Sequence, residues 1–232
     1  MSNKKLLIWL KICAVCFSVV FNSCKPEELP PEQPVGFSIS GHLDAPKAVL
    51  IKAFAGVTED DLRGYVVATS NLENGNFKLI LPDISEDKLV TNICLGFPAE
   101  WYEVSCLDAH YTGISYMNVY DSYRGTPFDA IGQVFCEKVF EKRDTPTEYY
   151  FNKVEKYWFY TDKDVTITGE YNEQGRIYIP DLSLKKGWNE VYEEHIVEID
   201  RQAGGTRIWT TFATTTKHEK YKDLEWYVSM YW

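Results

Sequence analysis

The sequence is short of positive charge, has no long helix-forming runs and lacks an apolar stretch long enough to span a membrane. Its 232 residues include 24 Lys and Arg against 34 Asp and Glu, which gives a formal net charge of −10. Nucleic-acid binding needs a basic face that neutralises phosphates, so this balance argues against a nucleic-acid partner. The missing runs of Ala, Leu, Glu and Lys disfavour helical bundles and coiled coils. With 45% hydrophobic and 15% aromatic positions, we expect a strand-rich globular protein.

Standard catalytic strings are also missing. The sequence contains no G-x-S-x-G, no H-E-x-x-H, no phosphate-binding glycine loop and no dinucleotide fingerprint. The acidic clusters at Glu59-Asp60-Asp61 and at Asp162 and Asp164 lack the glycine and distal glutamate of a calcium loop, so we expect solvated turn acids there. We predict a protein that is not an enzyme and that has no metal site and no cofactor.

The first 23 residues are typical of a targeting signal. Two lysines precede an apolar run, Leu6 to Phe21, that Lys11 interrupts. A membrane-spanning helix needs about 20 apolar residues, and this run is shorter and charged. We therefore interpret residues 1–23 as a secretory signal peptide that is removed. Its removal makes the net charge more negative, because the segment holds three lysines and no acid.

The junction Phe21-Asn22-Ser23-Cys24 resembles the lipobox of bacterial lipoproteins, in which a small residue precedes a cysteine that is lipidated. The resemblance implies a lipid on Cys24 and an outer-membrane protein of a Bacteroides-type cell. Residues 24–36 are rich in proline, which predicts an extended tether. Acidic residues follow Cys24 closely and resemble the surface-export tag of such lipoproteins. This implies surface exposure, and a periplasmic orientation stays open.

Three cysteines remain after Cys24, and their spacing is not that of a zinc site. A disulfide between Cys94 and Cys106 is permitted by an exported location, whereas three cysteines cannot all pair within one chain. The alternative is that Cys94, Cys106 and Cys136 are buried small side chains, since free cysteine is among the most buried residue types. Both interpretations stay open.

From Phe37 onward, short segments alternate between polar and apolar residues, as antiparallel strands with one wet face do. Asn74-Gly75 predicts a tight hairpin turn before the strand NFKLIL at 76–81. The only helical candidate is one turn at 85–89. We predict an all-β fold of antiparallel β-sandwich type with about eleven strands over residues 37–232. One large sandwich and two small ones both fit, with an internal seam near 125–146 in the second case.

Two segments resemble known proteins. FSISG at 37–41 and the Gly75-Asn76-Phe77 strand entry resemble the transthyretin-like or carboxypeptidase-regulatory-like β-sandwich, over about a quarter of the chain. That family is mostly a structural or adhesive module, so the resemblance implies a scaffold without catalytic residues. DVTITG at 164–169 and LSLKKGWNEVY at 182–192 resemble a recurring pattern of small Bacteroides-type surface lipoproteins whose function is poorly defined.

Aromatic side chains are the main candidates for ligand contact, because their rings stack on sugars and anchor protein interfaces. Most should fill or rim the sandwich. Trp101, which follows Pro98, and Trp188, which follows Gly187, lie at turn edges and are expected to be exposed, ligand-facing aromatics. Strand alternation directs Glu194 away from Glu193 and His195, which we also expect to be exposed.

These features predict a lipid-anchored cell-envelope protein that acts as a non-catalytic binding or adhesion accessory for a glycan or protein ligand. The alternatives are a carbohydrate-binding or glycan-processing surface lipoprotein and a structural pilus or envelope component. Coplanar exposed aromatics would favour glycan binding, two facing carboxylates in a cleft would favour hydrolysis, and an exposed edge strand would favour assembly.

Overall fold

The computed structural model describes residues 36–56, 64–91, 101–122, 129–202, 205–221 and 223–231. The predicted signal peptide, the lipidation site Cys24 and the tether up to residue 35 lie outside the described residues. The same holds for Cys94 and for the first expected seam position, at 125–127. These expectations therefore stay predictions. In the described ranges, no helix combines the length and the apolar character needed to cross a membrane.

The described residues form an all-β fold, as the sequence predicts, with fifteen strands instead of about eleven. The first seven are β1 (Phe37–His42), β2 (Leu50–Ala55), β3 (Tyr65–Asn71), β4 (Asn76–Leu81), β5 (Val90–Thr91), β6 (Glu103–Val104) and β7 (His110–Tyr120). The others are β8 (Gly132–Asp144), β9 (Glu148–Thr161), β10 (Val165–Thr168), β11 (Tyr171–Glu173), β12 (Arg176–Leu184), β13 (Gly187–Gln202), β14 (Gly205–Thr215) and β15 (Glu225–Met230). Short 3-10 helices lie at η1 (Glu86–Lys88), where one helical turn was predicted, and at η4 (His218–Tyr221). The additional strands include β5, β6 and β11, which are too short to show a periodic pattern.

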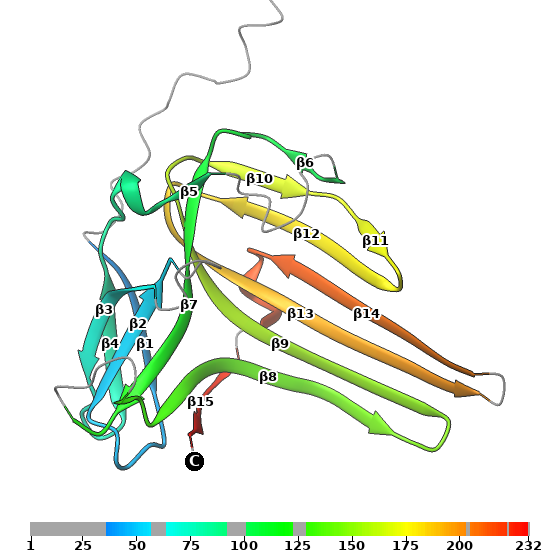
Figure 1. Cartoon of the computed structure of the whole chain (residues 1–232), viewed down its shortest axis with the longest axis horizontal. Coiled ribbons are helices and arrows are strands. Elements are labelled where there is room, and N and C mark those ends of the chain that lie inside the picture. Colours follow the sequence, from blue (N-terminus) through cyan, green and yellow to red (C-terminus); the bar gives the residue numbers. More distant parts are fainter. Residues whose placement is uncertain are drawn as a thin grey trace, which may run out of the picture. The chain divides into compact units, whose positions relative to one another are not determined.

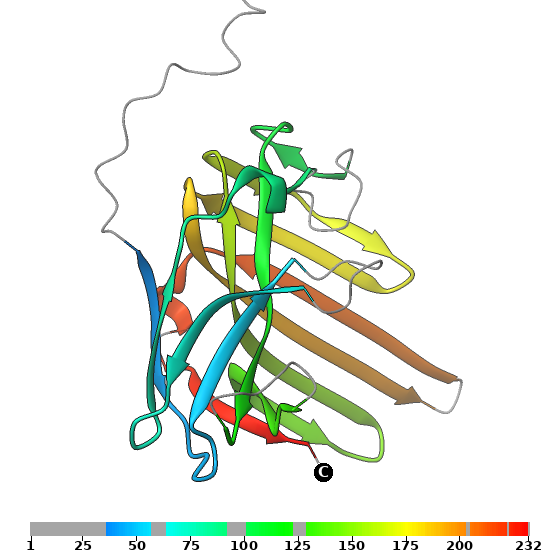
Figure 2. The same cartoon turned by 60° about the vertical axis from the view of Figure 1, so that its left-hand side comes forward.

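The strands belong to two sheets (Figure 1). A two-stranded sheet pairs β1 with β4, and a thirteen-stranded sheet runs in the order β3-β2-β7-β8-β9-β13-β14-β12-β10-β6, with β5, β11 and β15 attached at its side. Figure 2 shows β1 and β4 beside β2, β3 and β7. We call these five strands the sandwich body. Pairing is antiparallel with one exception among the described strands, because β12 lies parallel to β14.

The core of the sandwich body follows the predicted alternation. Phe77, Leu79 and Leu81 of β4 are buried and share one hydrophobic cluster with Ile39 of β1 and Ile51 of β2. Burial of a large apolar side chain contributes about 1.5–3 kcal/mol, so this inner face provides much of the stability of the fold.

The turn at Asn74-Gly75 forms as predicted, and it connects a strand of the large sheet with a strand of the two-stranded sheet. Both residues have positive φ, 52° and 80°, as a type I′ turn requires. Glu73 and Asn76 exchange both backbone hydrogen bonds across it, and this bridge is isolated. Beyond it, β3 pairs with β2 and β4 pairs with β1. The turn therefore carries the chain from one sheet to the other.

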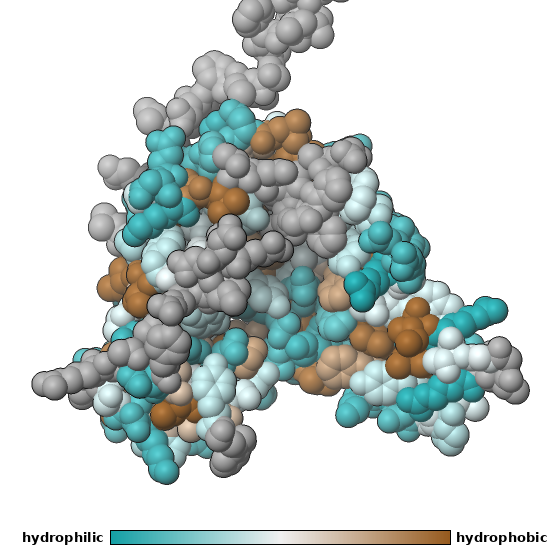
Figure 3. All heavy atoms as spheres, in the orientation of Figure 1, coloured by the Kyte–Doolittle hydropathy of each residue, from teal (hydrophilic) through white to brown (hydrophobic). Residues whose placement is uncertain are grey.

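Four long strands extend beyond the sandwich body (Figure 1). We call residues 138–144, 148–153, 196–202 and 205–210 of β8, β9, β13 and β14 the distal arm. No arm residue is buried among those whose side chains the structure describes. Hydrophobic residues gather over the arm portions of β13 and β14 (Figure 3), and Ile208 there is 57% exposed.

The second expected seam position, at 144–146, is the turn of the β8–β9 hairpin and not a domain boundary. Thr145 closes this turn, since its amide donates to the Glu148 carbonyl and its hydroxyl accepts from the Glu148 amide. The residues from Gly36 to Trp232 form one compact unit. At this position the sheet is therefore continuous, because β8 and β9 on either side of the turn pair with each other.

Candidate functional site

A cavity of about 400 Å³ lies on one face of the large sheet. Its volume is within the range of small-molecule sites. The lining consists of six aromatic rings, four aliphatic residues, one threonine and one glutamate: Tyr102, Tyr111, Tyr157, Phe159, Tyr178, Phe212, Ile167, Ile179, Pro180, Val191, Thr214 and Glu193. Ile167 and Val191 also belong to a small hydrophobic cluster, so the apolar side of the cavity is continuous with packed core.

Strand register places these residues together. Side chains directly opposite one another on neighbouring strands share a face of the sheet. Tyr157 of β9 is opposite Val191 of β13, and Glu193 of β13 is opposite Thr214 of β14. Thr214 is in turn opposite Pro180 of β12. Residues from four strands therefore line one cavity although they are far apart in the sequence.

A row of four carboxylates crosses this face next to the cavity. Glu225 of β15 is opposite Glu137 of β8, Glu137 is opposite Glu155 of β9, and Glu155 is opposite Glu193 of β13. We call these four residues the carboxylate row. Like charges opposite one another are destabilising unless they are protonated or paired with a cation. The row therefore makes this part of the sheet strongly acidic.

Lys153 partly neutralises the middle of the carboxylate row. Its Nζ lies 3.0 Å from Glu137 Oε2 and 2.8 Å from Glu155 Oε1, and the hydroxyl of Tyr157 donates to Glu155 Oε2 at 2.7 Å. Burial and a hydrogen bond with Glu155 raise the pKa of Glu137. Burial acts to raise the pKa of Glu155 as well, but its hydrogen bonds with Glu137 and Lys153 outweigh burial and lower it. Of these two carboxyl groups, Glu137 is therefore the one that binds a proton more readily.

Glu193 differs from the other partly buried glutamates of β8, β9 and β13. Glu190 forms an ion pair with Lys156 and accepts a hydrogen bond from Tyr192. Glu194 accepts hydrogen bonds from Asn152 and Tyr221, and Glu137 and Glu155 both form ion pairs with Lys153. In the described part of the chain, Glu193 is the one glutamate of this group without an ion pair or a hydrogen bond. Burial, and then the charge of Glu155, raise the pKa of Glu193. An unpaired carboxylate thus faces an aromatic cavity.

A row of stacked rings lies beside the carboxylate row on the same face. Tyr171, Tyr178, Phe212 and His195 are opposite one another on β11, β12, β14 and β13. Their successive ring centroids are 6.4, 5.2 and 4.6 Å apart, with interplanar angles of 26°, 9° and 11°. We call these four residues the aromatic row. Neighbouring rings cover one another's faces, so mainly ring edges are left to contact a ligand. Burial lowers the pKa of His195, which disfavours the charged form of the imidazole.

The two predicted ligand-facing tryptophans have different surroundings. Trp101 is half-buried and stacks on Tyr171 with ring centroids 3.5 Å apart, at the end of the aromatic row. The expected exposure of Trp188 is wrong, because Trp188 is only 5% exposed and packs in the main core. Its Nε1 donates to the Pro82 carbonyl at 2.8 Å. The turn before Trp188 directs its ring inward.

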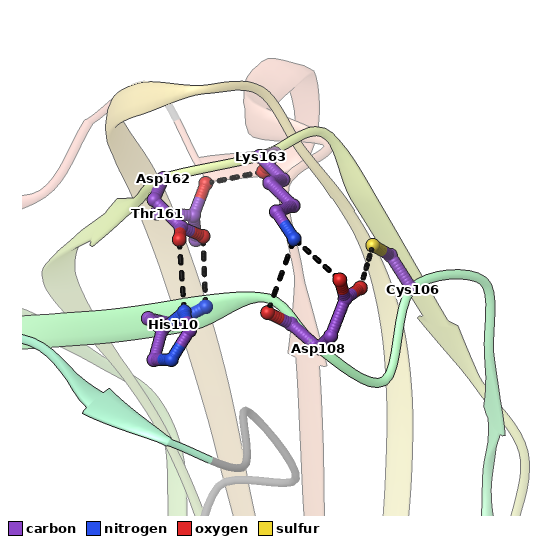
Figure 4. Close-up of polar contacts among 6 residues, drawn as sticks. All are labelled: Cys106, Asp108, His110, Thr161, Asp162 and Lys163. Atoms are coloured by element: carbon purple, nitrogen blue, oxygen red, sulfur yellow. Dashed lines mark hydrogen bonds and ion pairs between the residues drawn. The ribbon is translucent and has the colours of Figure 1, made fainter. Parts of the chain in front are cut away.

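The cysteine and histidine nearest to each other in sequence do not form a nucleophile and base pair (Figure 4). Cys106 donates to Asp108 Oδ1 at 2.9 Å, while His110 Nδ1 lies 2.9 Å from Asp162 Oδ2. Hydrogen bonds from Cys106 and Lys163 lower the pKa of the exposed Asp108 to about 2. These contacts tie the start of β7 to the β9–β10 turn. The Cys94–Cys106 disulfide stays a prediction, since Cys94 lies outside the described residues.

Other sequence expectations can be compared with the structure directly. Cys136 is buried, and burial raises its pKa to about 11, which agrees with a small packed side chain. Glu194 points away from Glu193 and His195 as predicted. The expectation that Glu193 and His195 are simply exposed is wrong, because both are half-buried, one in the cavity lining and one in the aromatic row. The polar and apolar alternation of the sequence correctly placed Glu193 and His195 on the same face of their strand. It could not show which strands lie opposite them, because those strands are distant in the sequence.

Comparison of the chain with protein-family models, with curated proteins and with solved structures gave no match in any of the three cases.

Proposed function

We propose that this chain is a non-catalytic binding protein of the cell envelope, anchored to the outer membrane by a lipid on Cys24 and exposed at the cell surface. Its ligand-binding site is the cavity lined by six aromatic rings, and its ligand is a small molecule with an apolar part. The observation that carries the proposal is the cavity itself, whose size and apolar lining suit such a ligand. The lipid anchor rests on the sequence around Cys24.

Two features of the site favour binding over hydrolysis. Glycoside hydrolysis needs two carboxyl groups about 5–9.5 Å apart on either side of the scissile bond. Among the described residues that line the cavity, Glu193 is the one carboxylate. The neighbouring Glu137 and Glu155 do not line the cavity, and both contact Nζ of Lys153, at 3.0 and 2.8 Å.

The aromatic row favours a small ligand in the cavity over a glycan on the sheet surface. A sugar stacks on the face of an exposed ring. In the row, Tyr178 and Phe212 are stacked on each other at 5.2 Å, and Phe212 is stacked on His195 at 4.6 Å. The faces that a sugar would need are therefore already covered.

The edge of β8 does not favour assembly by strand addition. Its arm residues Val139 and Phe140 are 48% and 47% exposed, and β15 pairs with β8 only over residues 132–137. The same stretch, KVFEKRD, carries five charged residues, and charged edge strands resist pairing with other strands. A binding function therefore fits the structure better than a structural role.

The cavity can be tested with the uncharged dye Nile red, whose fluorescence rises in apolar surroundings. The segment from Pro34 contains the whole compact unit and serves as the protein. We expect Thr214→Phe, which fills the cavity, to weaken dye binding by about tenfold or more. Thr211→Phe is the matched control, because Thr211 lies on the same strand opposite Ile196 and does not line the cavity. Equal dye binding by both variants, or no binding by the unmodified protein, would contradict the proposal.

The anchor is tested separately in cells. Cys24→Ala should abolish incorporation of a fatty-acid probe and release the protein from the membrane fraction, because several buried acyl chains supply about 0.8 kcal/mol per methylene. Ser23→Ala keeps a small residue before the cysteine and should leave labelling intact. Unchanged labelling of the Cys24→Ala protein would refute the lipid anchor without affecting the cavity.

A further inference from the structure

We infer that the cavity binds a small organic cation, an ammonium group carried on an apolar body, with Glu193 as its counterion. This inference rests on the proposed binding function and adds the chemical class of the ligand to it. The cavity combines six aromatic rings with one carboxylate, and that combination recognises organic ammonium groups.

Glu193 lacks the kind of bonded partner that the other partly buried glutamates have. A charge that is withdrawn from water costs free energy unless it is paired, and each of the other partly buried glutamates of β8, β9 and β13 has its partners within the protein. Glu193 has no ion pair and no hydrogen bond among the described residues. The charge of Lys153 acts on Glu193 in the direction that lowers its pKa, but Nζ of Lys153 is bonded to the neighbouring Glu155. A cationic ligand would supply the missing charge from inside the cavity.

The charge beside the cavity is predominantly negative. Glu193 is the end of the carboxylate row, in which four acids are opposite one another and Lys153 is hydrogen-bonded to two of them. His195, two residues along the same strand, has a lowered pKa because of burial and adds no positive charge. The field beside the cavity is therefore negative, which attracts cations and repels anions.

The rest of the lining is aromatic and aliphatic. Four of the lining rings lie outside the aromatic row: Tyr102, Tyr111, Tyr157 and Phe159. The ring planes of Tyr111 and Phe159 are inclined by 39° to each other, with centroids 6.4 Å apart, so these two rings are not stacked face to face. A cation over the face of an aromatic ring gains about 0.5–2 kcal/mol, most when it is desolvated. The apolar body of the ligand would contact Ile167 and Val191, on the side of the cavity that is continuous with the packed core.

A matched pair of probes tests the charge separately from the shape. Benzyltrimethylammonium and neopentylbenzene have nearly the same shape, and the second has carbon in place of the charged nitrogen. We expect the ammonium probe to displace Nile red at about tenfold lower concentration than the neutral probe. Glu193→Gln should weaken ammonium binding by about tenfold and leave neopentylbenzene binding within about twofold. Glu198→Gln, an exposed glutamate of the same strand outside the lining, should change neither.

The two probes also separate the possible failures. Equal affinity for both probes, or ammonium binding that Glu193→Gln leaves unchanged, overturns the cationic ligand while Nile red binding upholds the cavity as a binding site. Absence of binding by all three probes overturns the proposed function itself. Neopentylbenzene binding by Glu193→Gln shows that this variant is folded around an intact cavity.

The pH dependence of binding by the unmodified protein is a second readout that needs no variant. Protonation of Glu193 removes its charge, so ammonium binding should weaken on acidification, while neopentylbenzene binding stays constant. The loss should begin above the ordinary glutamate range, because burial and Glu155 raise the pKa of Glu193. The other groups around it are Glu155, Lys153 and Tyr157 on β9, His195 on β13, Thr214 on β14 and Tyr178 on β12. Ammonium binding that is constant down to the ordinary glutamate pKa of about 4.3 would overturn the inference.

Discussion

The sandwich body and the distal arm are built from the same kind of strand but are stabilised differently. In the body, large side chains such as Leu79 and Phe54 are almost completely inaccessible to solvent. In the arm, both faces of the sheet are wet, and Ile208 and Trp209 are among its exposed hydrophobic residues. Register is maintained there by an uninterrupted antiparallel ladder, which pairs β9 with β13 from Gly187 opposite Thr161 to Asp200 opposite Glu148.

The comparison shows where a binding site can be built. A closely packed interior leaves no volume for a ligand, and a sheet that is wet on both faces encloses none. The cavity lies beside the small hydrophobic cluster that contains Ile167 and Val191, so buried residues such as Val191 and half-buried ones such as Glu193 meet in one lining. The proposed binding site thus lies between buried and half-buried parts of the sheet.

The largest contrast should appear in stability. Leu79→Ala removes a side chain that is 0% exposed, and we expect it to lower the free energy of unfolding by about 2–5 kcal/mol. Ile208→Ala in the arm, where the side chain is 57% exposed, should change it by less than about 0.5 kcal/mol. Urea unfolding followed by tryptophan fluorescence measures both. Similar losses for the two variants would mean that the arm is part of the cooperative core.

A smaller contrast should separate the two tryptophans. Trp188→Phe removes the hydrogen bond to the Pro82 carbonyl and leaves that acceptor without its donor, so we expect a loss of about 1–3 kcal/mol. Trp101→Phe keeps a ring that can stack on Tyr171 and should cost less than about 1 kcal/mol. The measurement is again urea unfolding. A larger loss for Trp101→Phe would contradict the assignment of Trp188 to the core and of Trp101 to a half-buried position outside it.

Sequence alone predicted the parts of the fold that local patterns determine. The alternation in NFKLIL placed Phe77, Leu79 and Leu81 on one face, and all three are buried. Asp162 and Asp164 were correctly placed in a turn, although Asp162 is half-buried and bonded to His110 instead of simply solvated. The alternation also correctly placed Glu194 on the face opposite to that of Glu193 and His195. In each case the information lies within a few residues, where strand periodicity and turn chemistry act.

The site could not be predicted, because it depends on which strands become neighbours. The residues opposite Glu193, which are Glu155 and Thr214, come from strands that precede and follow β13, and β12 joins them through a parallel pairing that no local pattern indicates. The predicted exposure of Trp188 was wrong for a related reason. A residue after a turn glycine can point outward or inward, and the distant Pro82 carbonyl is what accepts its hydrogen bond.

The smallest expected effect is a change in stability when the charge of Glu193 is removed, and this substitution should stabilise the protein. Its pKa is raised in the folded protein by burial and by Glu155, so the stability that this group contributes is complete below the usual glutamate pKa and is lost as pH rises through the raised value. Glu193→Gln should therefore be slightly more stable than the unmodified protein at neutral pH and equal to it in acid. Urea unfolding at both pH values tests this, with Glu198→Gln as the unaffected control. A less stable Glu193→Gln at neutral pH would indicate a structural role for the carboxylate.

The central claim is that ligand binds in the cavity and not on the exposed surface of the arm, and a nuclear magnetic resonance titration tests it most directly. Benzyltrimethylammonium is added to the isotope-labelled segment from Pro34, and backbone amide shifts are followed residue by residue. The account predicts that saturable shifts cluster at Tyr157, Tyr178, Val191, Glu193 and Thr214, with little change at Ile208 and Trp209. Shifts confined to the arm, or the absence of saturable shifts anywhere, would contradict it.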